Sequence, residues 1–387
     1  MENQKYTLRE LVLYFLKLGS WGFGGPVALV GYMHRDLVEN KKWISEDEYR
    51  EGLALAQLAP GPLAAQLGIY IGFVHYRIWG ATLAGLAFVL PSFIMVVLLG
   101  MAYKLYSGLP WMQAVFYGVA AAVIGIITIS AYKLTIKSIS NLGVSAIRSG
   151  WLRWLFYFIG VIVTVITQKE EMLMFIAAGL IYMIVKAPPQ WMKRPAIIPI
   201  VLLSGIGFWN FEANTLEQIA LFFLKAGAFV FGSGLAIVPF LHSGVVGEFK
   251  WLTEQQFVDA VAVAMISPGP VVITVAFIGY LVAGFPGAAV AALATFIPCY
   301  VFTVALAPSF KRIAGNASIK AFVDGITAAV VGALVGSVII IALRTIVDVP
   351  TILIATGSVI SLLYVKKLQE SHIIIIAAII GLIIKFY

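Results

Sequence analysis

Apolar residues gather along this chain in thirteen runs, most of them about 15 to 25 residues long, which short polar stretches separate. Continuous runs of this length predict membrane-crossing helices, because a barrel strand would show only about ten residues of alternating polarity. We therefore expect an all-α integral membrane protein with about 13 transmembrane segments. The runs lie near residues 8–30, 52–74, 80–103, 113–132, 154–167, 172–185, 196–210, 217–241, 257–282, 287–308, 322–343, 350–365 and 371–386.

One part of this pattern occurs twice. Residues 17–62 return at 225–270 without a gap, and 16 of the 46 aligned positions are identical. After one deletion the match continues at an offset of 207, pairing Gly80 with Gly287, Pro91 with Pro298, Gly118 with Gly325, Gly125 with Gly332 and Ser130 with Ser337. An internal repeat of this length predicts three parts: a first half (1–187), a connecting segment with one short transmembrane helix (188–214) and a second half (215–387).

The run at 196–210 has no counterpart in either half. An odd connecting helix between two six-helix halves would invert the second half relative to the first. The basic residues agree with this count, since sixteen Lys and Arg fall in cytoplasmic loops and eight outside when the N-terminus is cytoplasmic. We expect a cytoplasmic N-terminus and an external C-terminus.

Composition excludes several classes of protein. With 61% hydrophobic and 11% charged residues, the chain has too little polar surface for a soluble protein of 387 residues. The net charge of +8 lies mainly in loops, where it sets orientation, so nucleic acid is not an expected partner. A single cysteine, Cys299, can form no internal disulfide and has no nearby ligands for a metal. The polar N-terminus of mixed charge argues against a removed signal peptide.

A helix start precedes a proline break in each half. Ser45 with Glu48, and Thr253 with Gln256, fit the capping box that opens a helix. Each helix would then run about 20 Å into Pro60-Gly61-Pro62 or Pro268-Gly269-Pro270, where two prolines must break it. Non-helical backbone at that depth persists only inside protein or beside a water-filled cavity.

The first run of each half is broken as well, at Phe23-Gly24-Gly25-Pro26 and at Phe231-Gly232-Ser233-Gly234. Free N–H groups at the start of the following half-helix carry partial positive charge and suit an anion. Four breaks that converge near a pseudo-two-fold axis would form one central binding site. The alternative is that they are ordinary kinks, because glycine and proline are common in membrane helices.

Charged and titratable residues flank these breaks at matched positions. Lys17 and Lys225 lie one or two turns before the glycine-rich breaks, where an ammonium is either functional or extends to the headgroups. His34 and His242 could be interfacial side chains, and their pKa range would also suit proton coupling.

Other polar residues divide unequally between the halves. Gln57 and Gln66 flank the first Pro-Gly-Pro, where the second half has Met265 and Thr274. The first half is therefore the more polar partner, and its amides and Ser20 could donate to an oxyanion. Trp43 and Trp251 fit interfacial anchors, and for Glu51, Asp259 and Asp324, near predicted helix ends, we expect solvent exposure.

Together, the Phe-Gly-Gly-Pro turn, the Trp-(Ile/Leu)-(Ser/Thr)-Glu helix start and the Pro-Gly-Pro, in two copies, resemble the chromate ion transporter family in its long, two-domain form. The resemblance implies a prokaryotic inner-membrane carrier with antiparallel repeats that exports chromate and confers resistance. It places the family's glycine-rich motif on residues 23–26 and its Pro-Gly-Pro on residues 60–62. The second half departs from that pattern at Ser233 and Gly234.

Chromate and sulfate are tetrahedral dianions of similar size, so a site of backbone N–H groups and one or two cations could accept either. A secondary transporter that works by alternating access is the leading hypothesis, and an anion channel is the alternative. An enzyme is not expected, because the sequence shows neither a metal-ligand cluster nor paired intramembrane carboxylates. No cofactor is expected, membrane lipid surrounds the chain, and a homodimer is compatible with the sequence.

Overall fold

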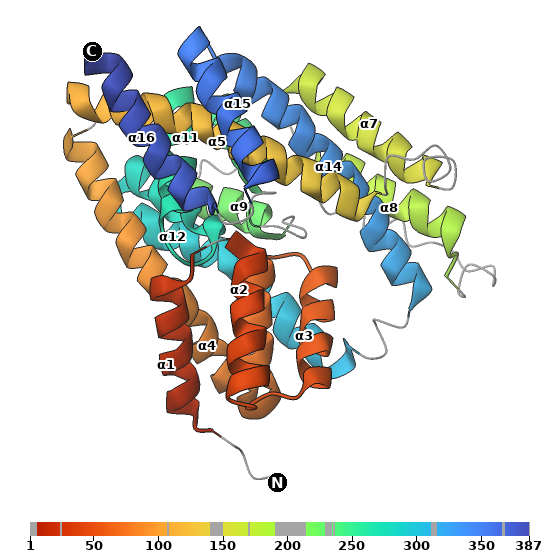
Figure 1. Cartoon of the computed structure of the whole chain (residues 1–387). Helices are drawn as coiled ribbons and strands as arrows, with labels where there is room; N and C mark the ends of the chain where they lie inside the picture. Colours follow the sequence, from red (N-terminus) through yellow and green to blue (C-terminus); the bar gives the residue numbers. More distant parts are fainter. Residues whose placement is uncertain are drawn as a thin grey trace.

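The computed structural model describes residues 6–23, 25–106, 108–139, 150–168, 171–189, 214–228, 234, 237–310, 316–365 and 368–386. Across these ranges the regular structure is helical, with no strand (Figure 1). In the first half the helices are α1 (Leu8–Trp21), α2 (Gly25–Met33), the π-helical η1 (His34–Asn40), α3 (Glu46–Leu58), α4 (Leu63–Tyr106), α5 (Pro110–Ser138), α7 (Trp151–Thr167) and α8 (Met172–Lys186).

Among the described residues, those from 215 to 386 form elements of similar kinds in a similar order, with two 3₁₀ turns that have no counterpart among the described elements of the first half. They are α9 (Thr215–Ala228), α10 (Ile237–His242), the π-helical η5 (Ser243–Glu248), α11 (Glu254–Ile266), the short 3₁₀ turn η6 (Val271–Ile273), α12 (Thr274–Leu306), the 3₁₀ turn η7 (Ala307–Ser309), α14 (Ala317–Thr345), α15 (Val349–Tyr364) and α16 (Glu370–Phe386).

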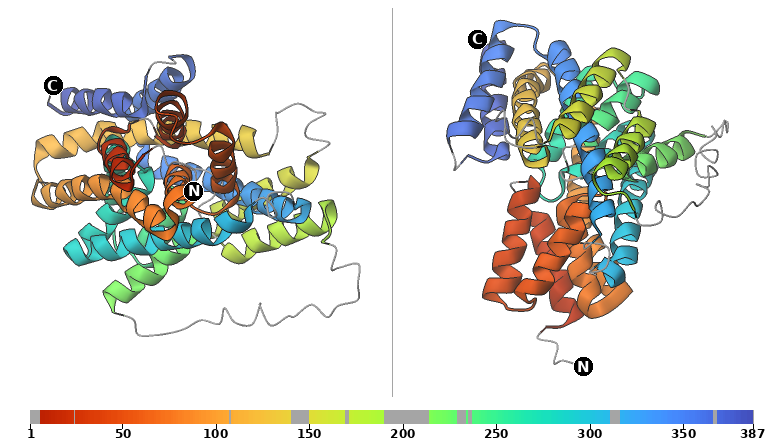
Figure 2. Two further views of the ribbon diagram at one scale, coloured as in Figure 1. Left: turned by 90° about the horizontal axis from the view of Figure 1, so that it is seen from below. Right: turned by 90° about the vertical axis from the view of Figure 1, so that its right-hand side faces the viewer.

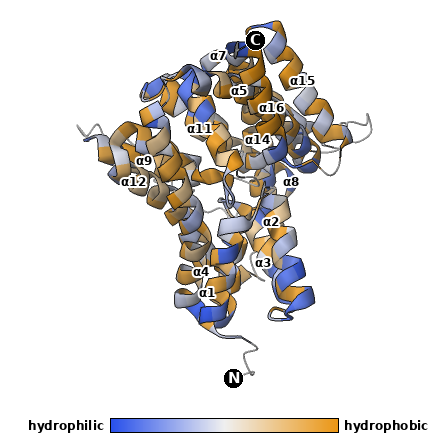
Figure 3. Cartoon of the chain, turned by 60° about the vertical axis from the view of Figure 1, so that its left-hand side comes forward, coloured by the Kyte–Doolittle hydropathy of each residue, from blue (hydrophilic) through white to orange (hydrophobic). Residues whose placement is uncertain are grey.

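Four stretches of helix are long and apolar enough to cross a membrane: Leu63–Tyr106, Pro110–Ser138, Val271–Ser309 and Ala317–Thr345. Shorter apolar helices are Trp151–Thr167, Met172–Lys186 and Val349–Tyr364. Hydrophobic residues predominate along the helices in Figure 3, and hydrophilic residues gather near the starts of α1 and α3. The chain is thus an all-α membrane protein, while the count of thirteen spans stays a prediction and run 196–210 lies outside the described residues.

The predicted helix starts and proline breaks are present. Ser45 and Thr253 cap α3 and α11, with Glu48 and Gln256 closing the two capping boxes. Helix α3 ends at Leu58 before the first Pro-Gly-Pro, and α11 ends at Ile266 before the second. Helices α1 and α2 are likewise separate. The loss of two N–H donors and the proline clash account for both Pro-Gly-Pro breaks.

Long helices α4 and α12 each fold back on themselves at one point. Non-helical residues, Arg77 in α4 and Gly284 in α12, have φ of 52° and 63°. Eight residues of straight helix would span about 12 Å, yet Gly72 packs directly on Gly80, where a Cβ would overlap the other's carbonyl oxygen. Each label therefore covers two antiparallel segments, as the separate apolar runs 52–74 and 80–103 indicated.

The last two helices of each half pack on the other half. Helix α5 packs against α15 and α16, whereas α14 packs against α7 and α8 (Figures 1 and 2). The approach is closest at small residues: Gly118 of α5 lies on Ala377 of α16, and its counterpart Gly325 of α14 lies on Ala178 of α8. Helices α4 and α12 also pack together, so the two halves interlock.

Candidate functional site

The second Pro-Gly-Pro lies against the break in the first half. The backbone N–H of Gly269 donates a 2.9 Å hydrogen bond to the carbonyl oxygen of Gly22, the residue that ends α1. Gly269 has φ of 92°, and a Cβ there would overlap the hydroxyl of Ser92 on α4. Only glycine meets both constraints without strain. The two breaks, 247 residues apart in sequence, are therefore in direct contact.

The first Pro-Gly-Pro has the reciprocal position. Gly61, with φ of 144°, lies so that a Cβ would come 3.0 Å from the Cβ of Cys299 on α12. Cys299 and Ser92 are equivalent at the offset of 207. Gln66, which is fully buried, donates from Nε2 to the carbonyl oxygen of Pro60 at 2.8 Å. Each Pro-Gly-Pro glycine thus contacts the same position on a long helix of the opposite half.

The glycine-rich breaks are described in part. Gly25 begins α2 with φ of 75°, and Pro26 follows within the same first turn. Gly234 lies near the residues that follow the second Pro-Gly-Pro, because a Cβ there would come 3.3 Å from Val272. The structure thus places Gly22, Gly234 and residues 268–270 in one region. Gly24, Phe231, Gly232 and Ser233 lie outside the described residues.

A polar cleft of about 790 Å³ opens beside the first break. Lys17, Gly22 and Phe23 line it together with residues of η1 and the following loop. Its charged side chains are Lys17, Arg35, Lys41, Glu10 and Asp36. Arg35 and Asp36 are paired at 3.1 Å. Lys17 is exposed where it lines the cleft, and it forms no ion pair among the described residues.

Two predicted site residues lie elsewhere. Lys225 is exposed on α9, and Gln57 is exposed on α3. Neither lines the cleft that contains Lys17. Among the described residues Lys225 forms no ion pair, so its position fits a side chain that extends toward headgroups as well as it fits a substrate contact.

Both predicted histidines contact the first carboxylate of a capped helix. His34 Nε2 lies 2.9 Å from Glu46 Oε2, and His242 Nε2 lies 2.7 Å from Glu254 Oε2. The rings of His34 and Tyr49, and of His242 and Phe257, make edge contacts at 5.0 and 5.2 Å. The spacing of twelve residues from each histidine to a glutamate is the sequence signal for these pairs.

The environments of these two pairs differ. The hydrogen bond from His34 holds the pKa of the exposed Glu46 below its usual value. Burial raises the pKa of Glu254, but the hydrogen bond to His242 and the pairing with Arg344 outweigh it and lower the pKa overall. His242 is 6% exposed, and Arg344 joins α14 to Glu254 and to Gln168.

The expectation of solvent exposure is wrong for Asp259, which is 2% exposed. Its carboxylate accepts hydrogen bonds from the Tyr103 hydroxyl at 2.7 Å and from Gln255 Nε2 at 2.8 Å. Helix α4 covers this part of α11, and the sequence pattern gave no sign of that packing. Among the described residues no group of three His, Cys, Asp or Glu side chains could hold a metal ion.

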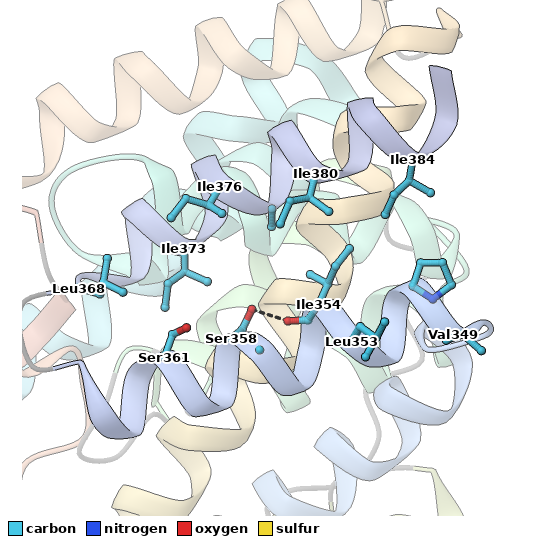
Figure 4. A pocket seen from close by; sticks show the side chains of 13 residues that line it. Val349, Leu353, Ile354, Ser358, Ser361, Leu368, Ile373, Ile376, Ile380 and Ile384 are labelled. Carbon is cyan, nitrogen blue, oxygen red and sulfur yellow. Dashed lines mark hydrogen bonds between the residues drawn. The ribbon is translucent and has the colours of Figure 1, made fainter. Parts of the chain in front are cut away.

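A second cavity, of about 450 Å³, lies between α15 and α16 (Figure 4). Its lining is mostly apolar, with Ile373 and Ile380 of α16 on one side and Ile354 of α15 on the other. The hydroxyl of Ser358 is used within its own helix, donating to the carbonyl oxygen of Ile354 at 2.8 Å. A dianion would find no compensating charge there, so the polar cleft is the better candidate.

Comparison with known proteins gives matches along nearly the whole chain. The family model described as chromate transporter matches residues 9–184 and 217–382. A "Chromate transport protein" of Cupriavidus metallidurans is 61% identical over 383 residues, which cover 98% of this chain and 93% of that protein. A "Probable chromate transport protein" of Synechococcus elongatus is 56% identical over 384 residues, which cover 98% of this chain and 96% of that protein.

A shorter relative matches only part of the chain. The "Uncharacterized transporter YwrB" of Bacillus subtilis is 29% identical over 179 residues, which make up 46% of this chain and 88% of that protein. No solved structure matches.

Proposed function

Because the chain belongs to the chromate transporter family, we propose that it is a secondary transporter that exports chromate across the cytoplasmic membrane. Two relatives at 61% and 56% identity over nearly the full length carry chromate transport in their names, which supports this substrate. Export of a dianion from a negative-inside cell is favoured by about 2.3 kcal/mol per charge per 100 mV. The membrane potential alone could therefore drive chromate export. Such export would lower cytoplasmic chromate and so confer chromate resistance.

One observation carries the proposal for the site: the second Pro-Gly-Pro contacts the first-half break beside a cleft that Lys17 lines. Backbone N–H groups at half-helix starts together with an ammonium suit a tetrahedral oxyanion. We propose that the substrate binds between these breaks and reaches them through the cleft. Since sulfate has the same shape and charge, it is the alternative substrate.

The proposed mechanism is alternating access by two inverted halves. Support comes from features that recur at an offset of 207 or 208: the capping boxes, the Pro-Gly-Pro breaks, the positive φ of Lys42 and Lys250, and the fold-back points at Arg77 and Gly284. The family match in two stretches and the half-length relative are consistent with a duplicated unit. A cytoplasmic N-terminus and an external C-terminus complete the proposed topology.

Chromate uptake into inverted membrane vesicles tests the proposal, with the potential and the pH gradient imposed separately. We expect saturable uptake that an interior-positive potential stimulates. Lys17→Ala should reduce it about tenfold, equivalent to about 1.4 kcal/mol of lost binding. Lys225→Ala is the matched control, because that lysine occupies the equivalent position outside the cleft. Its uptake should fall less.

Three results would count against the proposal. Absence of flux for chromate and sulfate under every gradient would rule out the substrate class. Flux that does not saturate and shows no counterflow stimulation would favour the channel. Equal uptake by Lys17→Ala and wild type, at matched protein levels, would contradict a binding site beside the cleft that Lys17 lines.

A further inference from the structure

A buried carboxylate joins the two halves away from the cleft. Asp259 belongs to α11 of the second half, and the Tyr103 hydroxyl that donates to its Oδ2 belongs to α4 of the first half. The tyrosine ring makes edge contacts with Phe277 of α12 at 5.4 Å and with Phe116 of α5 at 5.3 Å. The hydrogen bond therefore depends on how the halves are packed together.

The charge of Asp259 has neutral partners only. Its two oxygens accept from Tyr103 and from Gln255, and it forms no ion pair among the described residues. An unpaired carboxylate away from water costs several kcal/mol. A proton is the smallest cation that can neutralise it at this site.

Neighbouring charges are engaged elsewhere or make no contact with Asp259. Arg344 of α14 reaches α11 at Glu254, five residues before Asp259. No hydrogen bond or ion pair to Asp259 is formed by the other titratable groups on the described elements packed against α11. These are Tyr70, His75, Tyr76, Arg77, Lys104 and Tyr106 of α4, Tyr117, Tyr132, Lys133 and Lys137 of α5, Glu248 of η5, Tyr280, Cys299 and Tyr300 of α12, Lys320, Asp324 and Arg344 of α14, and Glu370, His372 and Lys385 of α16.

The first half holds a related but different arrangement. Glu51, the equivalent of Asp259, interacts with the Tyr70 side chain and is only half-buried. At the positions equivalent to Tyr70 and Tyr103 stand Phe277 and Phe310. The phenol that faces each carboxylate thus comes from a different position, and Asp259 alone takes it from the opposite half.

We propose that Asp259 binds and releases one proton in each transport cycle, so that chromate movement is coupled to proton movement; this rests on the proposed transport function. The carboxylate takes the proton from hydronium, which leaves water, and returns it to water in the other conformation. With Tyr103 donating, the ionised form is stabilised. When the halves move apart and this donor is lost, the protonated form gains, which links proton binding to conformation.

The test uses the purified full-length protein in liposomes that contain a trapped pH dye. Chromate flux is started at an alkaline pH where chromate is fully ionised, with the membrane potential clamped. We expect wild type to move protons together with chromate. Asp259→Asn should abolish the proton movement, while Glu51→Gln should retain it. Tyr103→Phe should reduce the number of protons moved per chromate, because the donor that distinguishes the two conformations is gone, and should move the pH midpoint of the remaining proton movement higher, because the ionised carboxylate loses a donor.

Wild-type chromate flux without a dye response would overturn the coupling, as would an unchanged ratio of protons to chromate in Asp259→Asn. If Asp259→Asn does not fold, Tyr103→Phe decides, and an unchanged midpoint counts against the proposal. Absence of wild-type chromate flux would instead contradict the proposed function.

Discussion

In the first half the Lys41 ammonium lies 4.0 Å from the ring of Trp43, and at the equivalent positions of the second half Phe249 stacks on Trp251 at 4.4 Å. Polar groups of the first half are also absent from the equivalent positions around this pair. Where the first half has Tyr14 and Asp36, the second has Phe222 and Gly244. One backbone arrangement therefore supports a polar cleft in one half and an aromatic cluster in the other.

Gly244 and Asp36 occupy equivalent positions, and the side chains around each explain why one is a glycine and the other an acid. A Cβ at Gly244 would overlap the ring of Phe222, so that position is filled by the aromatic cluster. At the equivalent position Asp36 lies 3.5 Å from the Tyr14 hydroxyl and pairs with Arg35. The second half has exchanged charge for packing, and its matched lysine, Lys225, does not line the cleft that Lys17 lines.

The largest loss of stability is expected when a charge from the cleft is introduced into the aromatic cluster of Phe222, Phe249 and Trp251. Gly244→Asp places a carboxylate against the Phe222 ring with no arginine beside it, since Ser243 stands where Arg35 does in the first half. We expect a loss of about 3–5 kcal/mol in stability, measured by thermal unfolding of the purified protein. Adding Phe222→Tyr should recover about 1 kcal/mol through a new hydrogen bond. Wild-type stability of Gly244→Asp would contradict this reading of the cluster.

An intermediate effect is expected from the opposite exchange. Lys41→Phe should stack on Trp43 as Phe249 does on Trp251, so stability should change by less than about 1 kcal/mol. Removal of one of three cations that line the cleft should raise the KM for chromate about threefold to tenfold. Lys42→Asn is the matched control, because Lys42 is a neighbouring cation that does not line the cleft. Equal KM values for Lys41→Phe and Lys42→Asn would show that the charge of the cleft does not contribute to chromate binding.

The smallest effect is expected on how thermal stability depends on pH, which the two histidine–glutamate pairs influence. Because the folded protein lowers the pKa of Glu254, its stabilising contribution is present above the unfolded value of about 4.5 and is lost as pH falls through the folded value. His242→Gln should therefore make thermal stability less sensitive to acid. His34→Gln should change it less, because Glu46 is exposed and solvent already screens its charge. A larger change from His34→Gln than from His242→Gln would contradict this order.

Much of the fold was predictable because it depends on local signals. Capping boxes and double prolines determine where α3 and α11 begin and end, whereas the duplication of the two halves stays a prediction. Apolar runs located the helices because membrane segments must satisfy their own backbone groups. The thirteen spans and their orientation stay predictions.

The site was predictable only in part. Lys17 and Phe23 line one cleft and Gly269 contacts Gly22, whereas the convergence of all four breaks on one binding site stays a prediction. Arg35 and Lys41 line the same cleft, and nothing in the sequence indicates it, because no local pattern shows that η1 faces α1. The expectation of solvent exposure for Asp259 is wrong because its cover comes from α4, more than 150 residues earlier in the chain. Contacts between distant segments leave no local pattern to read.

The interlocked helices also constrain biosynthesis. When residues 1–187 have left the ribosome, α5 is complete, yet the helices that cover its glycines have not been made. Gly118 and Gly125 stay uncovered until α15 and α16 follow near the end of translation. The first half must therefore wait in the membrane with an open groove, which makes assembly of the two halves a late and concerted event.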